Sequence, residues 1–478
     1  FKTTAERDSD TQTHTPPHNM LPWAKIRAAA VASGRASLVH KATTSFNLEM
    51  NTLAFDDQTV YAGTEALESF VESLHQASAK RPLLVTDEGV AKLSLIEDIK
   101  QSMAAKGMEP AIFDKCVPNP GVSDVVGIAE AFLKHECDSA VGVGGGGPLD
   151  AAKGGMALVA EHEALQGFEI ARDAPDFIKN KCRQFSKHVE ENPGLVDLIP
   201  LVAAIPTTAG TGSDGGKSAV ISDESGTKVV FGHPKLMPAY AALVPQFTTG
   251  LPARLTSATG VDAMFHSLEA YLVPTDIMIE RDGMTMEEIN RCDDFATKGI
   301  QLVVRHLRKA LDDPSDLEAR LGMQIAALYG AKAFRKGDLG GVHASAHALG
   351  AMFHTHHGEA IGRMAVPVLA HSEAQPHYPE DAQKRSAALA DVILDASESK
   401  SSASEPKKLS GVVEDFLGQF KASGVAVGAA DLLSSDSAEA ESQIRELARL
   451  AAADGCQTNP VALSEEDYLG VFQRARGM

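Results

Sequence analysis

The sequence predicts two domains: an N-terminal α/β domain with a Rossmann-like parallel sheet, followed by an all-α C-terminal domain. Short apolar runs alternate with amphipathic stretches from about residue 50 to 245. Long segments with helical spacing follow after residue 251, without a convincing strand among them. Apolar runs of strand length are typical of parallel sheets that are covered on both faces. We therefore expect a disordered or targeting extension over residues 1–45, the α/β domain over 46–250 and the helical domain over 251–478.

The composition favours a small-molecule ligand over nucleic acid or a membrane. The 478 residues carry a formal net charge of -20 and no run of Lys and Arg, so polyanions are repelled on average. No stretch approaches the roughly 18 to 20 apolar residues of a membrane-spanning helix. The five cysteines are scattered, which disfavours a disulfide framework and a thiolate zinc site. We expect the cytoplasm, or the mitochondrial matrix if the basic segment 20–47 is a transit peptide.

The α/β pattern is clearest in three apolar runs, 82–86, 140–143 and 201–205, which we predict to be strands. Ala and Leu recur with helical spacing in four later segments, so we predict helices over 253–273, 291–311, 315–334 and 437–453. Two segments, 160–197 and 396–410, interrupt these patterns and are expected to be surface insertions.

Three segments that follow the predicted strands are candidates to hold a dinucleotide. The run 140–153 passes through four glycines into a helix, where backbone amides can approach a diphosphate. A plain structural turn is the alternative. Asp87 directly follows the run 82–86, where its carboxylate would accept hydrogen bonds from ribose hydroxyls and disfavour NADP. A helix cap is the alternative role for this carboxylate. The hydroxyl-rich loop 205–214 would donate to the cofactor or form an ordinary turn.

The helical half carries a stronger signal, a set of histidines with one carboxylate. Asp262 and His266 are four residues apart in a predicted helix, so they face the same side and could share a cation. Five of the seventeen histidines fall within residues 343–357. Such a density among apolar residues is costly to bury without a compensating partner; a solvated histidine face is the alternative. The string 354–357 also faintly suggests a dinuclear metallohydrolase, but lacks the usual carboxylate.

Taken together, these segments resemble the iron-dependent (group III) alcohol dehydrogenase family. The resemblance covers residues from about 46 to the end and rests on GGGGPLDAAK, IPTTAGTGSD, ATGVDAMFHSLEAYL, GGVHASAHALG and HHGEA. It implies the dehydroquinate synthase-like fold of that family, with His347 near the nicotinamide and the metal as a catalytic proton conduit. The metal ligands that it implies are Asp262, His266, His343 and His357. The cofactor-binding residues that it implies are Asp87, Asn119, Gly144, Gly145, Gly146, Asp150, Thr207, Thr208, Thr211 and Lys228.

The chain departs from the family pattern at four positions. Gly147 stands where Ser is usual and Asp214 where Glu is common. His356 stands where Pro often precedes the last ligand, and Val461 where Arg often follows Asn-Pro. No implied metal ligand is lost, so these departures bear on the cofactor loop and the substrate pocket.

The resemblance implies a dehydrogenase that transfers a hydride between NAD(H) and a primary or secondary alcohol or its aldehyde or ketone. Fe2+ is the implied metal, although the ligand types would also suit Zn2+ or another divalent ion. The alternatives are a glycerol- or lactaldehyde-type dehydrogenase of the same fold and, from another class, a metal-dependent hydrolase. Lys217, Arg335 and Lys336 would suit a hydroxy acid or semialdehyde, with surface charge as the simpler explanation. We expect a homodimer or higher homo-oligomer.

Overall fold

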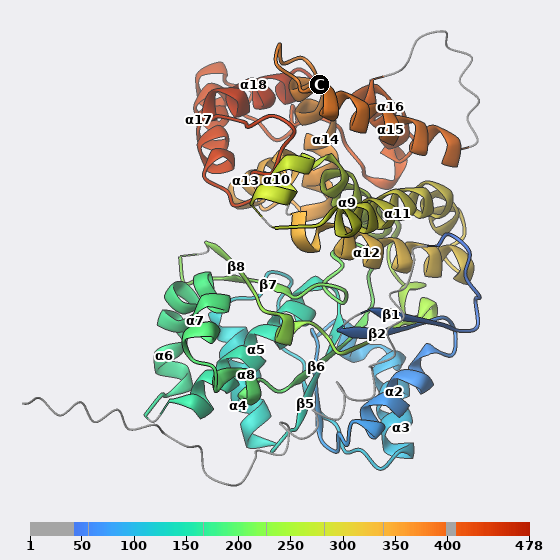
Figure 1. Ribbon diagram of the computed structural model, residues 1–478, viewed down its shortest axis with the longest axis vertical. Helices are drawn as coiled ribbons and strands as arrows, with labels where there is room; N and C mark the ends of the chain where they lie inside the picture. Colours follow the sequence, from blue (N-terminus) through green and yellow to red (C-terminus); the bar gives the residue numbers. More distant parts are fainter. Residues whose placement is uncertain are drawn as a thin grey trace, which may run out of the picture.

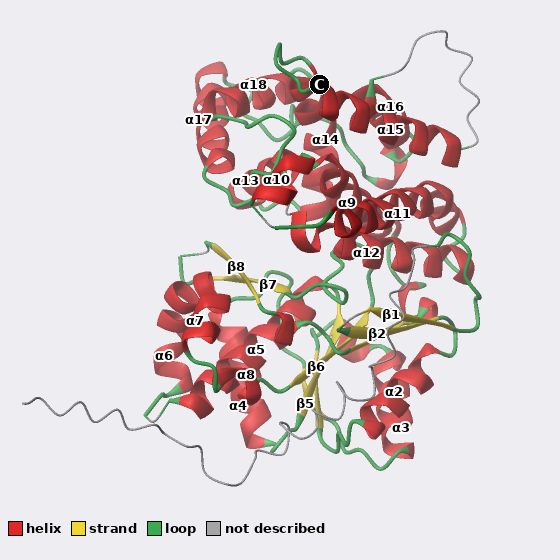
Figure 2. Ribbon diagram, in the orientation of Figure 1, coloured by secondary structure: helices red, strands yellow, loops and turns green. Residues whose placement is uncertain are grey.

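The computed structural model describes residues 43–55, 57–165, 167–225, 227–281, 283–337, 339–397 and 408–478, without the side chains of 335–337. Residues 1–42 of the predicted extension 1–45 and most of the predicted insertion 396–410 therefore lie outside the described residues. Figure 1 shows an α/β half below and a helical half above. In Figure 2 the strands are confined to the lower half, so the predicted order of α/β and helical parts is confirmed.

The α/β half is built on a seven-stranded sheet with the order β1-β2-β9-β6-β5-β3-β4. The edge strand β1 (Asn51–Phe55) is antiparallel to β2 (Gln58–Ala62), and all other neighbours are parallel. The other strands are β3 (Pro82–Val85), β4 (Ala111–Phe113), β5 (Ser139–Gly144), β6 (Leu201–Pro206) and β9 (Tyr240–Leu243). Four of them, β3, β5, β6 and β9, are buried along their whole length. The three predicted strands coincide with β3, β5 and β6.

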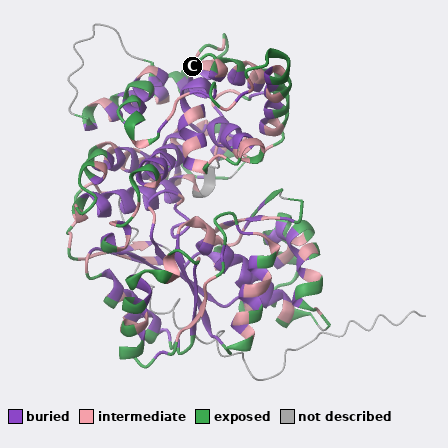
Figure 3. Ribbon diagram, turned by 180° about the vertical axis from the view of Figure 1, so that it is seen from behind, coloured by how far each residue is buried: buried purple, intermediate pink, exposed green. Residues whose placement is uncertain are grey.

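Helices cover both faces of this sheet, because successive side chains of a strand point to opposite faces. Leu84 and Val141 pack with α2 (Ala66–Gln76) and α3 (Ser94–Ala105). Leu83 and Ala140 pack on the other face with α4 (Val122–Lys134) and α5 (Gly146–Ala164). Figure 3 shows the buried strands between helices with exposed outer faces. Since α5 begins two residues after β5, its N-terminus lies at the carboxyl edge of the sheet.

Residues 160–197, expected to be a surface insertion, are largely exposed, but a few of their side chains join the core of the α/β half. They form the end of α5 and then α6 (Ile170–Asp176), α7 (Phe185–Glu191) and α8 (Leu195–Leu198). Phe177 and Phe185 are each 1% exposed and pack edge to face. Phe185 also packs on Phe231 of β8 (Lys228–Gly232), which forms a hairpin with β7 (Ser218–Ser222). The segment is polar on average, so its few buried aromatic residues were not apparent from the sequence.

The helical half packs around one large apolar cluster. Its helices are α9 (Ala253–Leu272), α10 (Thr275–Glu280), α11 (Met286–Asp312), α12 (Leu317–Gly337), α13 (Gly341–Phe353), α14 (His357–Glu373), α15 (Glu380–Ala396), α16 (Leu409–Gly418), α17 (Ser437–Ala452) and α18 (Glu465–Arg476). The four predicted helices correspond to α9, α11, α12 and α17, and the described residues beyond β9 contain no strand. None of the described helices combines the length and apolar character needed to cross a lipid bilayer.

Candidate metal and dinucleotide site

The central helix α9 supplies three chemically active side chains from one face. Asp262, His266 and Glu269 are spaced by four and then three residues, which aligns them along one side of a helix. All three are at most 5% exposed. Between Thr256 and Ala270 the other residues of α9 are apolar or small and are also buried, because the helix lies in the middle of the helical half with α11, α12 and α14 packed against it. The polar face therefore points into protein, and its groups need partners there.

Two histidines from other helices converge on the Asp262 carboxylate. His343 lies in the first turn of α13 and His357 is the first residue of α14. Asp262 Oδ1 is 3.7 Å from His343 Nε2 and 3.5 Å from His357 Nε2. The ligand atoms of these three residues all lie within 4.8 Å of one another. His266 Nε2 is 3.7 Å from Asp262 Oδ1 but is outside that trio.

The chain between His343 and His357 turns sharply, and glycine permits the close approach. His354 ends α13 in the left-handed conformation, with φ of 53°. At Gly358 a Cβ would lie 2.1 Å from the Ala258 carbonyl oxygen, so α14 can begin against α9 only with glycine there. This contact brings His357 to Asp262. His354 and His356 are exposed and do not belong to the trio.

The side chains fit a divalent cation. Asp262 Oδ1 and His343 Nε2 are buried without a hydrogen-bond partner, which is costly unless another group completes them. Ligand atoms about 2.1 Å from a tetrahedral ion are roughly 3.4 Å apart, close to the 3.5–3.7 Å separations from Asp262. One carboxylate and three imidazoles are ligand types suited to iron or zinc.

The electrostatics of the four candidate ligands favour the metal-binding protonation state for most of them. Burial lowers the pKa of His266 and of His357, which favours the neutral, metal-ligating form of each imidazole. Burial opposes ionisation of Asp262, but the neighbouring imidazoles outweigh it and lower its pKa. Burial also opposes protonation of His343, yet Glu269 and Asp262 raise its pKa to about 9. A cation that binds His343 Nε2 must therefore displace a proton.

His347 lies beside this trio, one turn after His343 on α13. Its ring stacks on that of His357 with centroids 5.2 Å apart. Its Nδ1 donates to Asp454 Oδ2 at 3.0 Å, and ligand atoms of His347, Asp454 and Cys456 lie within 4.8 Å of one another. Asp454 and Cys456 follow α17, and the sequence did not single out Asp454. The structure thus places His347 next to the candidate ligands, and the hydrogen bond from Nδ1 to Asp454 orients its ring.

Apart from Asn119 and Lys228, the predicted dinucleotide residues follow three adjacent strands, β6, β5 and β3. The chain continues from β3 to β4 on one side, whereas β5 lies on the other, and such a reversal of strand order is where α/β sheets bind ligands. Asp87 Oδ1 caps the following turn by accepting from Gly89 N and Val90 N. Its Oδ2 faces Gly144, where a Cβ would come within 3.5 Å. Both interpretations of Asp87 are therefore compatible with its position.

The glycine turn and the hydroxyl-rich loop pack tightly on each other at this edge. Gly144 has φ of 145°, and a Cβ on Gly146 would lie 2.7 Å from the Thr211 side chain. A Cβ on Gly147 would lie 2.9 Å from the carbonyl oxygens of Val117 and Pro118. The departure from Ser at Gly147 thus has a structural reason in this chain. Thr207 and Thr208 stand in the same loop, with Thr207 N donating to Gly144 O at 2.9 Å.

Other predicted cofactor residues differ in how available they are. Asp150 accepts from Ser213 Oγ and Val220 N through its two oxygens, so it braces the loop. The fully buried Lys153, which the sequence analysis missed, donates to Ser213 and to Ser218 O. Its place among alanines in the first two turns of α5 was the available signal. Asn119 and Lys228 are exposed.

The hydroxyl-rich loop also contacts the helical half. His266 Nδ1 donates to Gly210 O at 3.2 Å, which leaves Nε2 for the Asp262 side. Lys332 of α12 donates to Gly215 O at 3.0 Å and to Gln58 Oε1 at 2.6 Å. The candidate cofactor loop and the candidate metal ligands are therefore held against one another by direct hydrogen bonds.

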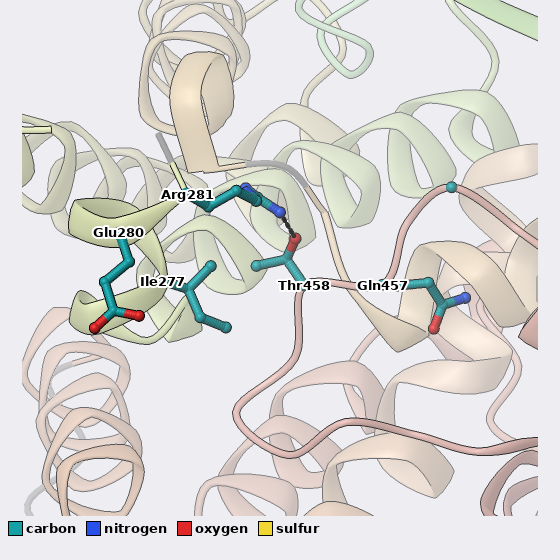
Figure 4. Close-up of a pocket in the computed structure, with 6 residues that line it drawn as sticks. Ile277, Glu280, Arg281, Gln457 and Thr458 are labelled. Carbon is teal, nitrogen blue, oxygen red and sulfur yellow. Dashed lines mark hydrogen bonds between the residues drawn. The ribbon is translucent and has the colours of Figure 1, made fainter. Parts of the chain in front are cut away.

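A separate pocket of about 360 Å³ lies between α10 and residues 455–458. Figure 4 shows Arg281 reaching across it to Thr458, with Nη1 donating to Oγ1 at 3.0 Å. Glu280 and Gln457 also line it, whereas none of the predicted site residues does. Of the three cations considered for a substrate carboxylate, Lys217 is half-buried next to the cofactor loop, and the side chains of Arg335 and Lys336 are outside the described residues.

Comparison with known proteins covers both halves. Residues 57–245 match the family described as iron-containing alcohol dehydrogenase, and residues 256–476 match the C-terminal part of that family. The chain is 35% identical over 274 residues to a 4-hydroxybutyrate dehydrogenase of Cupriavidus necator, and the aligned residues make up 57% of this chain and 63% of that protein. It is 30% identical over 420 residues to alcohol dehydrogenase 4 of Saccharomyces cerevisiae, and that alignment covers 87% of this chain and 96% of the yeast protein. A crystal structure of 1,3-propanediol oxidoreductase aligns at 27% identity with a TM-score of 0.68, covering 90% of this chain and 100% of that one.

Proposed function

The chain belongs to the iron-containing alcohol dehydrogenase family, and from this premise we propose that it is a metal-dependent, NAD-dependent alcohol dehydrogenase. The observation that carries the proposal is the convergence of three imidazole Nε2 atoms on the buried Asp262 carboxylate. A glycine turn and a hydroxyl-rich loop stand at the carboxyl edge of the sheet, and the loop contacts the ligand set. A metal-dependent hydrolase would need the four ligands but would leave the glycine turn and the hydroxyl-rich loop without a role.

We propose that Asp262, His266, His343 and His357 hold Fe2+, on the basis of the family and of the donor types. A divalent cation bound there lowers the pKa of an alcohol hydroxyl and polarises the carbonyl of the product. Once His343 has released its proton, the protein supplies one negative charge and neutral imidazoles, so a divalent ion keeps a net positive charge. Nδ1 of His266 is fixed by Gly210 O, which directs Nε2 to the site.

NAD is the dinucleotide that we propose for the edge of the sheet. The amides of the glycine turn and the N-terminus of α5 would receive the diphosphate. Asp87 Oδ2 would accept from the adenosine ribose, and its charge would repel a 2'-phosphate. The exposed Asn119 and Lys228, together with Thr207, Thr208 and Thr211, would complete the pocket. Asp150 would act through the loop that it braces.

We assign proton transfer to His347. Its Nδ1 proton is held by Asp454, so Nε2 is the nitrogen that can exchange a proton. Its ring stacks on that of His357, which is itself a proposed ligand of the cation. The exposure of the His347 side chain, 20%, gives the proton a route to solvent.

For the substrate we propose primary alcohols and hydroxy acids, because the relative from Cupriavidus necator is a 4-hydroxybutyrate dehydrogenase. We propose the cytoplasm as the compartment, because the five cysteines are scattered along the sequence, which does not suggest a disulfide framework and suits a reducing environment. We also propose a homo-oligomer, because β1 is an edge strand and a second copy of the chain could extend the sheet by pairing with its outer side.

A single assay tests the activity. Protein reconstituted anaerobically with Fe2+ is given NAD and a panel that includes 1-butanol and 4-hydroxybutyrate, and NADH absorbance is followed. We expect turnover with at least one alcohol, and loss of turnover after chelation and in Asp262→Asn. Absence of NADH formation across the panel, or full activity in the chelated protein, would overturn the proposal.

A further inference from the structure

Glu269 is a buried carboxylate that the proposed reaction does not use. It lies on α9 seven residues after Asp262, so two helical turns separate the two acids on one face. Its side chain is 6% exposed. Oε2 accepts a hydrogen bond from His343 Nδ1, and Oε1 accepts one from Val342 N at 2.8 Å. Both partners are in the first turn of α13.

We propose that Glu269 is a positioning residue that fixes the tautomer and the orientation of His343, so that its Nε2 lone pair is presented to a divalent cation. An imidazole that donates from Nδ1 keeps its other nitrogen free as a ligand atom. In this chain that nitrogen, Nε2, faces Asp262 and has no hydrogen-bond partner. The inference rests on the proposed metal site and adds a residue outside its four ligands.

A second role of Glu269 must be separated from the first. The N-terminal amides of a helix need acceptors, and Glu269 serves Val342 N in this way. Asn459 Oδ1 accepts from the adjacent amide, Gly341 N, at 2.6 Å. The two side chains share the capping of α13, but only Glu269 contacts the histidine. This difference gives a matched pair of variants.

Glu269→Gln keeps the length of the side chain and can still accept from Val342 N through its carbonyl oxygen. The amide nitrogen then faces His343 Nδ1 and can only donate, so Nδ1 must accept and the ring proton moves to Nε2. The protonated Nε2 cannot bind a cation. Asn459→Ala removes a cap but leaves the Glu269–His343 hydrogen bond in place.

The test measures binding rather than turnover. Zn2+ affinity is obtained by competition with a chromophoric chelator, and the visible spectrum of the Co2+-loaded protein reports ligand geometry. For Glu269→Gln we expect a 10- to 100-fold rise in the Zn2+ dissociation constant, the range for loss of an outer partner of a ligating histidine, and an altered Co2+ spectrum. Asn459→Ala should bind Zn2+ within about 2-fold of wild type, with a lower melting temperature before metal is added.

A third variant controls for the loss of any buried carboxylate. Glu161 is 1% exposed and accepts from His188 Nε2 at 2.8 Å within the α/β half. Glu161→Gln should leave Zn2+ affinity unchanged. Wild-type affinity in Glu269→Gln, or an equal loss of affinity in Asn459→Ala, would overturn the proposal. If wild-type protein itself bound neither Zn2+ nor Co2+, the proposed metal site would fail instead.

Discussion

Gly358→Ala would test how α9 and α14 assemble the candidate ligands. A Cβ at position 358 would lie 2.1 Å from the Ala258 carbonyl oxygen and 2.6 Å from its carbon, both rigid backbone atoms. Ordinary contact begins at 3.4 Å, so the helices must separate by more than about 1 Å. Ala258 is one turn before Asp262, and His357 precedes Gly358 directly. The separation of the helices would therefore lengthen the 3.5 Å distance between Asp262 Oδ1 and His357 Nε2.

The expected effect follows from the tolerance of metal sites. Ligand distances are held within about 0.2 Å, and a 1 Å misplacement costs on the order of 100-fold in rate. We expect the Fe2+ or Zn2+ dissociation constant of Gly358→Ala to rise about 100-fold, with a similar fall in turnover. Metal content after reconstitution and NADH absorbance measure the two quantities. Circular dichroism checks that the variant is folded.

Gly350→Ala is the matched control, because it adds the same methyl group to α13, close to the same histidines. The new Cβ would meet its nearest neighbour, Thr355 O, at 3.6 Å, an ordinary contact. Alanine within a helix is favoured over glycine by roughly 0.5–1 kcal/mol, so this variant should keep its metal affinity and melt slightly higher. Wild-type metal affinity in Gly358→Ala would refute the reasoning about the contact between α9 and α14.

Two further predictions concern histidines. His347→Ala should retain metal within about 2-fold while kcat falls by roughly 100- to 10,000-fold, the range for loss of a general acid or base; loss of metal would make His347 a ligand instead. Burial lowers the pKa of His306 to about 4, against about 6.5 in an unfolded chain. The unfolded state therefore binds the proton first, and the free energy of unfolding should drop by about 3 kcal/mol as the pH falls from 6.5 to 4. In His306→Leu, urea unfolding should show a shallower drop, and an unchanged pH profile would contradict the assignment.

The parts of the site that could be predicted from the sequence are those set by local spacing. Asp262 and His266 share a face because a helix repeats every 3.6 residues, and the structure brings both together with His343 and His357. The same spacing places Glu269 on that face, a signal that was present but not used. Strand assignments succeeded for the same reason, since runs buried on both faces are apolar throughout.

The remaining parts depend on contacts between segments far apart in sequence. His347 and Asp454 are 107 residues apart, and His343 and Glu269 are 74 residues apart. No periodicity reports such pairs, because they follow from how helices pack. The buried side chains within residues 160–197 could not be predicted for a related reason: mean polarity hides a few phenylalanines that face the core. Whether a carboxylate beside a strand, such as Asp87, caps a turn is also decided by the fold, and here Oδ1 caps the turn while Oδ2 lies next to Gly144.

The loop 207–215 connects the candidate cofactor pocket in one half to the candidate metal ligands in the other. Lys153 holds it from the α/β half through Ser213 O, and Lys332 holds it from the helical half through Gly215 O. Between these anchors, Gly210 O fixes the ring of His266, while the threonines of the loop face the glycine turn. A shift of the loop would therefore move a candidate metal ligand and the candidate cofactor pocket together. Because hydride transfer needs both partners at contact distance, this shared loop is the element on which their alignment depends.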